Sequence, residues 1–414
     1  MTPYVVTGLG VASAIGIGRE AFFDAVHAGV RATELVEGQR PETFDPSAYM
    51  PLPANARVAE VRGFDAAKYL GDKGLRSLDR LTKLLVVAAR LALHDARLKK
   101  DGAWASGPDG KASGPGPAET GMVVSNAYGS LEAITELDRV AVLEDARYIN
   151  PSRFPLTVSN SAAGYVSIWE DLRALNVSVS DGNCGALDAV AAADAMLENG
   201  RAEALLVGGA EAMSEALFLA FHRLGAGGGA AQAPGAQGTV QACIGEGSAL
   251  LVLEEPASAA NRGAPALAEV IGYGTSFRAP ERDAALVHPS PEAMQRAVED
   301  ALADAGVEAR AVDLVVSGLS GLRGFDDAEL KALGRVLGED TAVVAPKMGL
   351  GETLGAGGAI GMATAIALLR LSPGPVAPPY LVRGGLRAAV RTVLVTSLGY
   401  YGNASALVMR AAAS

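Results

Sequence analysis

The stretch Ser178 to Val190, SVSDGNCGALDAV, places a cysteine where a reactive thiol is expected. Cys184 follows a β-branched run and a turn of small residues, and it precedes an alanine-rich segment with the pattern of a buried helix. The free N–H groups and the dipole at a helix N-terminus favour the thiolate, the nucleophilic form of cysteine. Cys184 is therefore a candidate nucleophile. The alternative is a structural role, because free cysteines are commonly small core residues.

The other residues that could do chemistry are few and scattered. The four histidines lack the spacing of a metal site and are interpreted as surface or core residues: His27, His94, His222 and His288. Cys243 precedes IGEG on a predicted strand and is interpreted as a core residue. We expect no metal site.

The elements that must position Cys184 alternate between strands and helices. Strands are predicted at 4–10, 121–130, 202–212 and 248–255, the first of them running into a glycine turn. Helical patterns cover 79–98, which has a polar face, and 183–200, which is apolar nearly all round and therefore central. Two stretches rich in small residues are predicted to be loops: 99–119 on the surface, and 224–242, flexible or irregular.

The second half of the chain repeats this order. VDLVVSGLSG at 312–321 echoes TGMVVSNAYG, 345–369 echoes the loop and helix around Cys184, and 391–410 echoes the two strands at 202–212 and 248–255. Alternating βα units imply sheets covered by helices. We therefore expect a layered α/β fold with two duplicated halves, 1–256 and 257–414, and a site where their glycine-rich loops meet.

Composition limits the classes of function. The 414 residues are half apolar and one fifth charged, which is typical of a globular protein. A net charge of −11 argues against nucleic acid as the main partner. Two cysteines give no disulfide framework and favour a reducing cytoplasm. The first residues lack a basic leader region, and no run reaches the ~18 apolar residues of a membrane span, so we expect no membrane association.

Five motifs are spread over residues 4 to 408: the opening strand YVVTGLGVASAIG, the strands LLVGGAEAM and GEGSALLVLEE, the lysine loop APKMGLGETLGAGGA and the hairpin SLGYYGNASALV. In sequence and order they resemble the β-ketoacyl synthases of the thiolase superfamily. The resemblance implies a thiolase-like fold with α-β-α-β-α layers. It also implies a catalytic cysteine, which takes the acyl group, and two histidines, which stabilise an oxyanion during decarboxylation.

The family's cysteine should stand seventeen residues before the glycine that closes the buried helix. That glycine is identified as Gly200, so the cysteine position holds Asn183. Cys184 falls one residue late, and a one-residue step on a helix turns the side chain by roughly 100°. We expect Cys184 to point away from the reaction centre or to flank it.

Both histidine positions are also replaced. Alignment on Asp326 and Glu329 puts Gly318 at the first, and Glu352, five residues after Lys347, stands at the second. Three losses on an intact framework resemble the chain-length factor, the inactive partner of the type II polyketide ketosynthase. The chain departs from that family's usual glutamine at Asn183 but keeps the Leu-Asp-Ala run that follows.

The resemblance implies a non-catalytic subunit in a heterodimer with an active ketosynthase. It maps the interface to residues 121–170 and a tunnel for the growing polyketide or polyene chain along it. Four residues at helical spacing are candidates for the tunnel lining or the dimer core: Tyr128, Leu131, Ile134 and Leu137. Acyl carrier protein would bind mainly through the partner, because this chain is itself acidic. No cofactor is implied, and the product stays open.

Residual chemistry is the alternative. Cys184, Lys347 and Tyr400 are predicted to border what remains of the pocket. Cys184 with Glu352 as base would make an active acyltransferase or condensing enzyme, although Glu352 could equally be a structural partner of Lys347. The amide of Asn183 could assist malonyl decarboxylation. A third class is a scaffold that binds acyl carrier protein without a ketosynthase.

Overall fold

The computed structural model describes residues 1–35, 41–44, 58–105, 114–223, 230–232, 239–281, 287–371, 377–386 and 389–412. One long sheet runs through these residues in the order β16-β15-β14-β17-β18-β13-β1-β12-β8-β6-β7. Its strands are β1 (Tyr4–Ser13), β6 (Thr120–Ser125), β7 (Asn176–Val179), β8 (Ala204–Glu211), β12 (Gly247–Glu254), β13 (Ala268–Phe277), β14 (Leu314–Val316), β15 (Ala342–Val344), β16 (Leu381–Arg383), β17 (Thr392–Leu398) and β18 (Asn403–Arg410).

The predicted duplication is present in the sheet. The first half contributes β7-β6-β8-β12-β1, and the second contributes β15-β14-β17-β18-β13 with the same parallel and antiparallel pairings. The halves join where β1 pairs antiparallel with β13, with Val6 opposite Ala268. The position of the division along the chain, between 256 and 257, stays a prediction.

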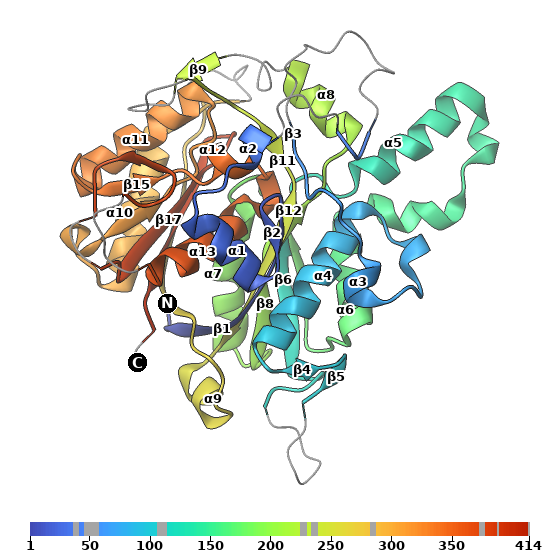
Figure 1. The fold of residues 1–414 in the computed structure, drawn as a ribbon, viewed down its shortest axis with the longest axis horizontal. Coiled ribbons are helices and arrows are strands. Elements are labelled where there is room, and N and C mark those ends of the chain that lie inside the picture. The colour runs from blue at the N-terminus through green and yellow to red at the C-terminus, as the bar shows by residue number, and fades with distance from the viewer. Residues whose placement is uncertain are drawn as a thin grey trace.

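The two halves of the sheet are the two β layers. Helices between them and outside them complete the predicted α-β-α-β-α order (Figure 1). The central layer is α7 (Gly185–Glu198) and α13 (Gly357–Leu369), packed against strands of both halves. On the outside, α4 (Arg80–Asp95) and α6 (Ser161–Glu170) cover the first half, whereas α10 (Pro291–Ala305) and α11 (Arg323–Leu337) lie over the second. Strands enclosed on both faces explain why their sequences are continuously apolar.

The glycine turn predicted after residue 10 is wrong, because β1 continues to Ser13. A Cβ atom at Gly10 would overlap the carbonyl oxygen of Ala88, and one at Gly8 that of Ala92, both on α4. The two glycines therefore let the helix lie close to the strand. Gly272 and Gly274 of β13 perform the same task beneath α10, so the duplication extends to this packing detail.

The remaining elements are short or lie at the periphery. The helices are α1 (Arg19–His27), α2 (Ala32–Leu35), α3 (Ala67–Leu70), α5 (Leu131–Val140), α8 (Glu215–Arg223), α9 (Pro256–Asn261) and α12 (Lys347–Leu350). The short strands are β2 (Gly16–Ile17), β3 (Val58–Ala59), β4 (Lys99–Lys100), β5 (Ala103–Trp104), β9 (Ala230–Gln232), β10 (Thr239–Gln241) and β11 (Ile244–Gly245). None of the helices in the described ranges combines the length and apolar character needed to cross a bilayer.

The two predicted loops contain paired strands. β4 pairs with β5 inside 99–119, and β9 pairs with β10 inside 224–242, where the sequence alone predicts irregular structure. Residues 106–113, 224–229 and 233–238 of these predicted loops lie outside the described residues.

One segment extends from the body of the molecule. Residues 130–158, here called the arm, comprise α5, a π-helical turn at Ala141–Asp145 and 3-10 turns at Ala146–Tyr148 and Pro151–Thr157 (Figure 1). Gly129, at a positive φ of 65°, lies against Ser159, so both ends of the arm leave the body at one place.

Candidate functional site

The turn after β7 delivers Cys184 to the N-terminal end of α7, as predicted, but the thiol is enclosed. Cys184 is fully buried, and its Sγ donates a hydrogen bond to the carbonyl oxygen of Ser397 at 3.2 Å. Burial raises the pKa of Cys184 well above its ordinary value, and the carboxyls of Asp188 and Asp181 raise it further. These effects outweigh the helix dipole, and a protonated thiol is a poor nucleophile.

Asn183 is held in the same corner. Its Nδ2 donates to the carbonyl oxygen of Leu398 at 2.7 Å, and the hydroxyl of Ser397 donates to its backbone oxygen at 2.7 Å. The side chain is buried, and its Oδ1 has no hydrogen-bond partner among the described residues. The atom left over is an acceptor, whereas stabilising an oxyanion requires donors.

Glu352 forms an ion pair with Lys347, the structural partner that the sequence suggests for it. Both carboxylate oxygens lie 3.0 Å from Nζ of Lys347, and the two residues are 3% and 5% exposed. The backbone N–H of Leu354 donates to Oε1 at 2.8 Å, and the hydroxyl of Tyr400 donates to Oε2 at 3.1 Å. Three donors therefore satisfy this buried carboxylate.

A side chain at Gly318, such as the histidine that the resemblance would place there, would have to displace its neighbours. A Cβ atom on it would lie 3.1 Å from a carboxylate oxygen of Glu329 and 3.2 Å from the carbonyl oxygen of Thr396. Glu329 accepts the N–H of Gly318 at 2.8 Å and the hydroxyl of Thr396 at 2.6 Å. A buried carboxyl, whose pKa burial raises, thus fills this space.

The end of β17 contacts all three positions that the sequence analysis predicts to be replaced. Thr396 lies beside Gly318 and donates a hydrogen bond to Glu329. Ser397 and Leu398 hydrogen-bond to Asn183. Tyr400 donates a hydrogen bond to Glu352. Sequence reasoning singles out Tyr400 on this segment but misses its neighbours. The signal that could have found them is the SLGYYGN motif itself, since its residues Ser397, Leu398 and Tyr400 each hydrogen-bond to Asn183 or Glu352.

Further carboxyls surround this centre. Burial raises the pKa of Glu211 to about 8, while backbone N–H groups including that of Ala127 act in the opposite direction. Burial likewise raises the pKa of Asp326 to about 7, although the N–H groups of Ser320 and Gly321 bind it. The centre is a packed polar core rather than an open pocket.

The predicted lining residues lie at the foot of the arm. Tyr128 is exposed, Ile134 and Leu137 are half-buried, and Leu131 packs into an apolar cluster around Phe218. None of these four lines the large cavity beneath the arm, which has a volume of about 1210 Å³. Their contact with a partner's tunnel stays a prediction.

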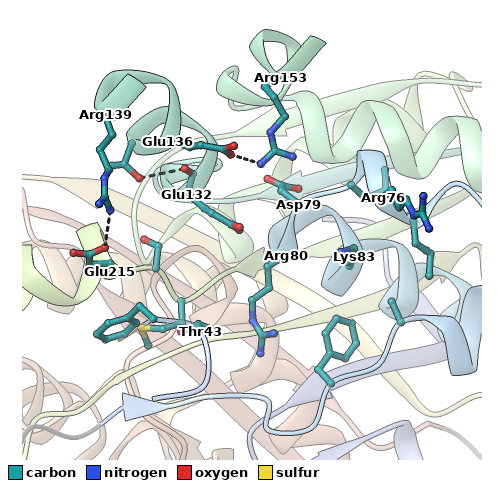
Figure 2. Close-up of a pocket in the computed structure, with 18 of the residues that line it drawn as sticks. Thr43, Arg76, Asp79, Arg80, Lys83, Glu132, Glu136, Arg139, Arg153 and Glu215 are labelled. Atoms are coloured by element: carbon teal, nitrogen blue, oxygen red, sulfur yellow. Dashed lines mark hydrogen bonds and ion pairs between the residues drawn. The ribbon is translucent and has the colours of Figure 1, made fainter. Parts of the chain in front are cut away.

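The polar face of α5 lines that cavity instead. Most of its charged lining residues come from the arm, from α8 and from the start of α4 (Figure 2): Asp79, Arg80, Lys83, Glu132, Glu136, Arg139, Glu144, Arg153 and Glu215. Asp65 and Arg76 add to them from the segment before α4. Arg139 points to Glu215 at 3.8 Å, and Arg153 pairs with Glu136 (Figure 2). The first of these ion pairs ties the arm to the body.

Comparison with known proteins gives consistent matches. The family model for the N-terminal domain of beta-ketoacyl synthase matches residues 1–259, and that for the C-terminal domain matches 267–378. A putative polyketide beta-ketoacyl synthase 2 of Streptomyces coelicolor is 33% identical over 98% of this chain and 94% of its own length. The tetracenomycin polyketide synthase ketoacyl synthase beta subunit of Streptomyces glaucescens is 30% identical over 99% and 98%.

Solved structures share the whole fold. The ishigamide ketosynthase/chain length factor superposes with a TM-score of 0.83 at 26% identity, over the full length of both chains. A beta-ketoacyl synthase from Burkholderia phymatum gives a TM-score of 0.82 at 26% identity, also over both full lengths.

Proposed function

The chain belongs to the β-ketoacyl synthase family and has its thiolase-like fold, and on that premise we propose that it is a non-catalytic subunit. It pairs with an active β-ketoacyl synthase and shapes the tunnel that holds the growing polyketide or polyene acyl chain. The observation that carries this proposal is the state of the three catalytic positions. Asn183, Gly318 and Glu352 replace the family's cysteine and histidines, and each is packed among partnered groups.

The exposed apolar side chains support a protein partner. Seven large ones lie between residues 128 and 168: Tyr128 39%, Val142 76%, Leu143 72%, Tyr148 70%, Phe154 64%, Val158 48% and Ile168 77% exposed. A group of exposed apolar residues on one segment is typical of an interaction surface. This segment falls within the predicted interface at 121–170.

The remaining roles follow from that arrangement. Tyr128, Leu131, Ile134 and Leu137 line the tunnel or the dimer core at the base of the arm. The partner carries most of the acyl carrier protein contact, because a net charge of −11 on this chain repels an acidic carrier. Cys184 and Cys243 are buried and form no disulfide in the described part of the chain, which suits a reducing cytoplasm.

Two alternatives involve chemistry in this chain. An active acyltransferase needs Cys184 as a thiolate, and the buried, protonated thiol speaks against it. Decarboxylation assisted by Asn183 needs a donor that faces the reacting group. The amide nitrogen of Asn183 is buried and donates one of its two N–H groups to the carbonyl oxygen of Leu398. A scaffold for acyl carrier protein alone would leave the exposed arm without a ketosynthase to cover it.

Co-expression with the cognate ketosynthase tests the pairing. We expect a 1:1 complex on size-exclusion chromatography and native mass spectrometry. Condensation activity is expected only when the partner's catalytic cysteine is present. A stable homodimer of this chain that condenses acyl units by itself would overturn the proposal. Micromolar binding of carrier protein by the chain, with no ketosynthase complex, would favour the scaffold.

A further inference from the structure

Two charged residues that line the cavity beneath the arm each have a buried atom without a partner. Asp79 directly precedes α4, is 4% exposed, and accepts the backbone N–H of Thr82 on its Oδ1 at 3.0 Å. Its Oδ2 has no hydrogen-bond partner among the described residues, and the same is true of Nε of Arg153. Such atoms are costly, because they have lost water without gaining a partner. One is a negatively charged acceptor and the other a positively charged donor, so each could satisfy the other.

The two residues belong to different walls of the cavity. Arg153 lies in the 3-10 turn Pro151–Thr157 of the arm, whereas Asp79 belongs to the body. Figure 2 shows both side chains at the cavity, with the guanidinium of Arg153 turned to Glu136 of α5. Among the described residues, no ion pair joins Arg153 to Asp79. The arm and the body thus carry complementary groups that do not bind each other in this structure.

The present partner of Arg153 holds it only weakly. Glu136 is 52% exposed, and ion pairs at such exposed carboxylates contribute little because water and salt screen them. The carboxylate of Asp79 is shielded from water, and charges attract more strongly there. A guanidinium can bind one carboxylate through two of its nitrogens at once. An exchange of Glu136 for Asp79 would therefore give both unpartnered atoms a hydrogen bond.

The cavity separates the arm from the body, and its mouth is continuous with the apolar surface of the arm. Closing the cavity brings Glu132 and Glu144 of the arm closer to Asp79, and like charges oppose that approach. Leu143 lines the cavity and is 72% exposed, and Phe154 of the 3-10 turn is 64% exposed. A partner that covers these two apolar side chains therefore lies against the outer wall of the cavity and pushes the arm toward the body.

We propose that the arm is a strap that closes onto the body when the ketosynthase binds, and that Arg153 then leaves Glu136 and pairs with Asp79. This inference rests on the proposed function, the pairing of this chain with a ketosynthase. Burial of the apolar outer side of the arm supplies the free energy that closes the cavity. The ion pair formed inside then holds the outer side in the position that the partner binds.

Affinity for the ketosynthase, measured by calorimetric titration, tests the exchange with two variants of opposite expected effect. Asp79→Asn should weaken binding about tenfold, because one partner of a buried charge pair is lost. It keeps the cap of α4, since asparagine caps a helix as well as aspartate does. Glu136→Gln should instead strengthen binding about threefold, because it removes the competing partner of Arg153. Asp72→Asn, an exposed carboxylate that does not line the cavity, is the matched control and should leave the affinity unchanged.

A double-mutant cycle tests whether Arg153 and Asp79 act as a pair. Arg153→Gln should also weaken binding about tenfold, and the double variant should bind no more weakly than either single variant. Two independent residues would instead give a loss of about a hundredfold. Such additive losses, or wild-type affinity of the folded Asp79→Asn chain, would overturn this inference.

The distance between the arm and the body gives a readout that does not depend on affinity. Spin labels are attached at Asp138→Cys on α5 and at Lys73→Cys before α4, both exposed positions, while the buried Cys184 and Cys243 stay unlabelled. Pulsed electron paramagnetic resonance should give a shorter distance in the complex than in the free chain. Equal distances would overturn the closure. Failure of the wild-type chain to bind a ketosynthase is a separate outcome, which would overturn the proposed function and this inference with it.

Discussion

The centre around Glu352 and the arm differ in how far their side chains are buried and find partners within the chain. Lys347 and Glu352 are nearly inaccessible and bonded to each other and to their neighbours, whereas Leu143 and Tyr148 on the arm are mostly exposed. In the inner region the buried ion pair makes its contacts within the chain. The outer region keeps apolar surface that only another molecule can cover. This contrast is what the proposed role, association with a partner without chemistry at Cys184, would require.

Removing Glu352 should have the largest effect on stability. Glu352→Ala leaves Lys347 buried without its carboxylate, and breaking a buried pair in this way costs about 3–5 kcal/mol of unfolding free energy. Urea denaturation of the purified chain measures it. The control is Glu308→Ala, whose exposed pair with Arg310 is worth about 0–1 kcal/mol. Equal losses for both variants would contradict a partnered inner centre.

Restoring a family histidine at 318 should also destabilise the chain. Gly318→His forces atoms onto Glu329 and Thr396, and overpacking of this kind costs about 1–3 kcal/mol. Gly324→His, near the start of α11, is the control, because no atom lies within 4 Å of a Cβ built there. The comparison uses the same denaturation assay. A tolerated histidine at 318 would mean that the site is still open.

Changes on the arm should weaken association and leave folding nearly unchanged. Leu143→Ser and Tyr148→Ser should each reduce affinity for the ketosynthase by about 2 kcal/mol if they are anchor residues of the interface. The free energy of unfolding of the isolated chain should stay within about 0.5 kcal/mol. Calorimetric titration with the partner and urea denaturation separate the two quantities. Phe277→Ser, exposed outside the arm, should affect neither.

The smallest predicted effect depends on pH. Burial, together with a hydrogen bond to Asp181, raises the pKa of Asp188 from 3.8 to about 7, although Ser405 and Tyr273 donate hydrogen bonds to it. The folded chain thus holds a proton that the unfolded chain releases, so Asp188 lowers stability as pH rises from about 4 to 7. Asp326 and Glu211 act in the same direction, the latter up to about pH 8. Melting temperatures across this range measure the slope. Asp188→Asn should reduce the loss of stability between pH 4 and 7 by about 1 kcal/mol or more. An unchanged pH dependence in this variant would contradict the role given to Asp188.

The sequence predicts the parts of the fold that depend on local pattern. Alternating strands and helices and the repeated order of 312–321, 345–369 and 391–410 follow from period and small residues, and the structure confirms the layers. Gly8 and Gly10 led to the wrong prediction of a turn, because they instead allow α4 to pack closely against β1. The residues of α4 that they contact are more than seventy positions away in the sequence. Such a requirement has no local signature.

The candidate site likewise has contacts that the sequence predicts and contacts that it does not. The pairing of Glu352 with Lys347 is predictable because the two are five residues apart. The occupation of Gly318's space by Glu329 and the aromatic contacts of Tyr400 arise from helices that fold back onto β17, which spacing does not reveal. At the arm, helical spacing selects Ile134 and Leu137, whereas the most exposed large apolar residues of the arm lie beyond the helix, at Val142 and Leu143.

One measurement tests the central claim most directly. The chain, alone and co-purified with its ketosynthase, is incubated with a labelled acyl-carrier thioester, and the intact subunits are then weighed by mass spectrometry. The account predicts label on the partner's catalytic cysteine and none on this chain. Stoichiometric acylation of Cys184 would contradict it and would make this chain an enzyme.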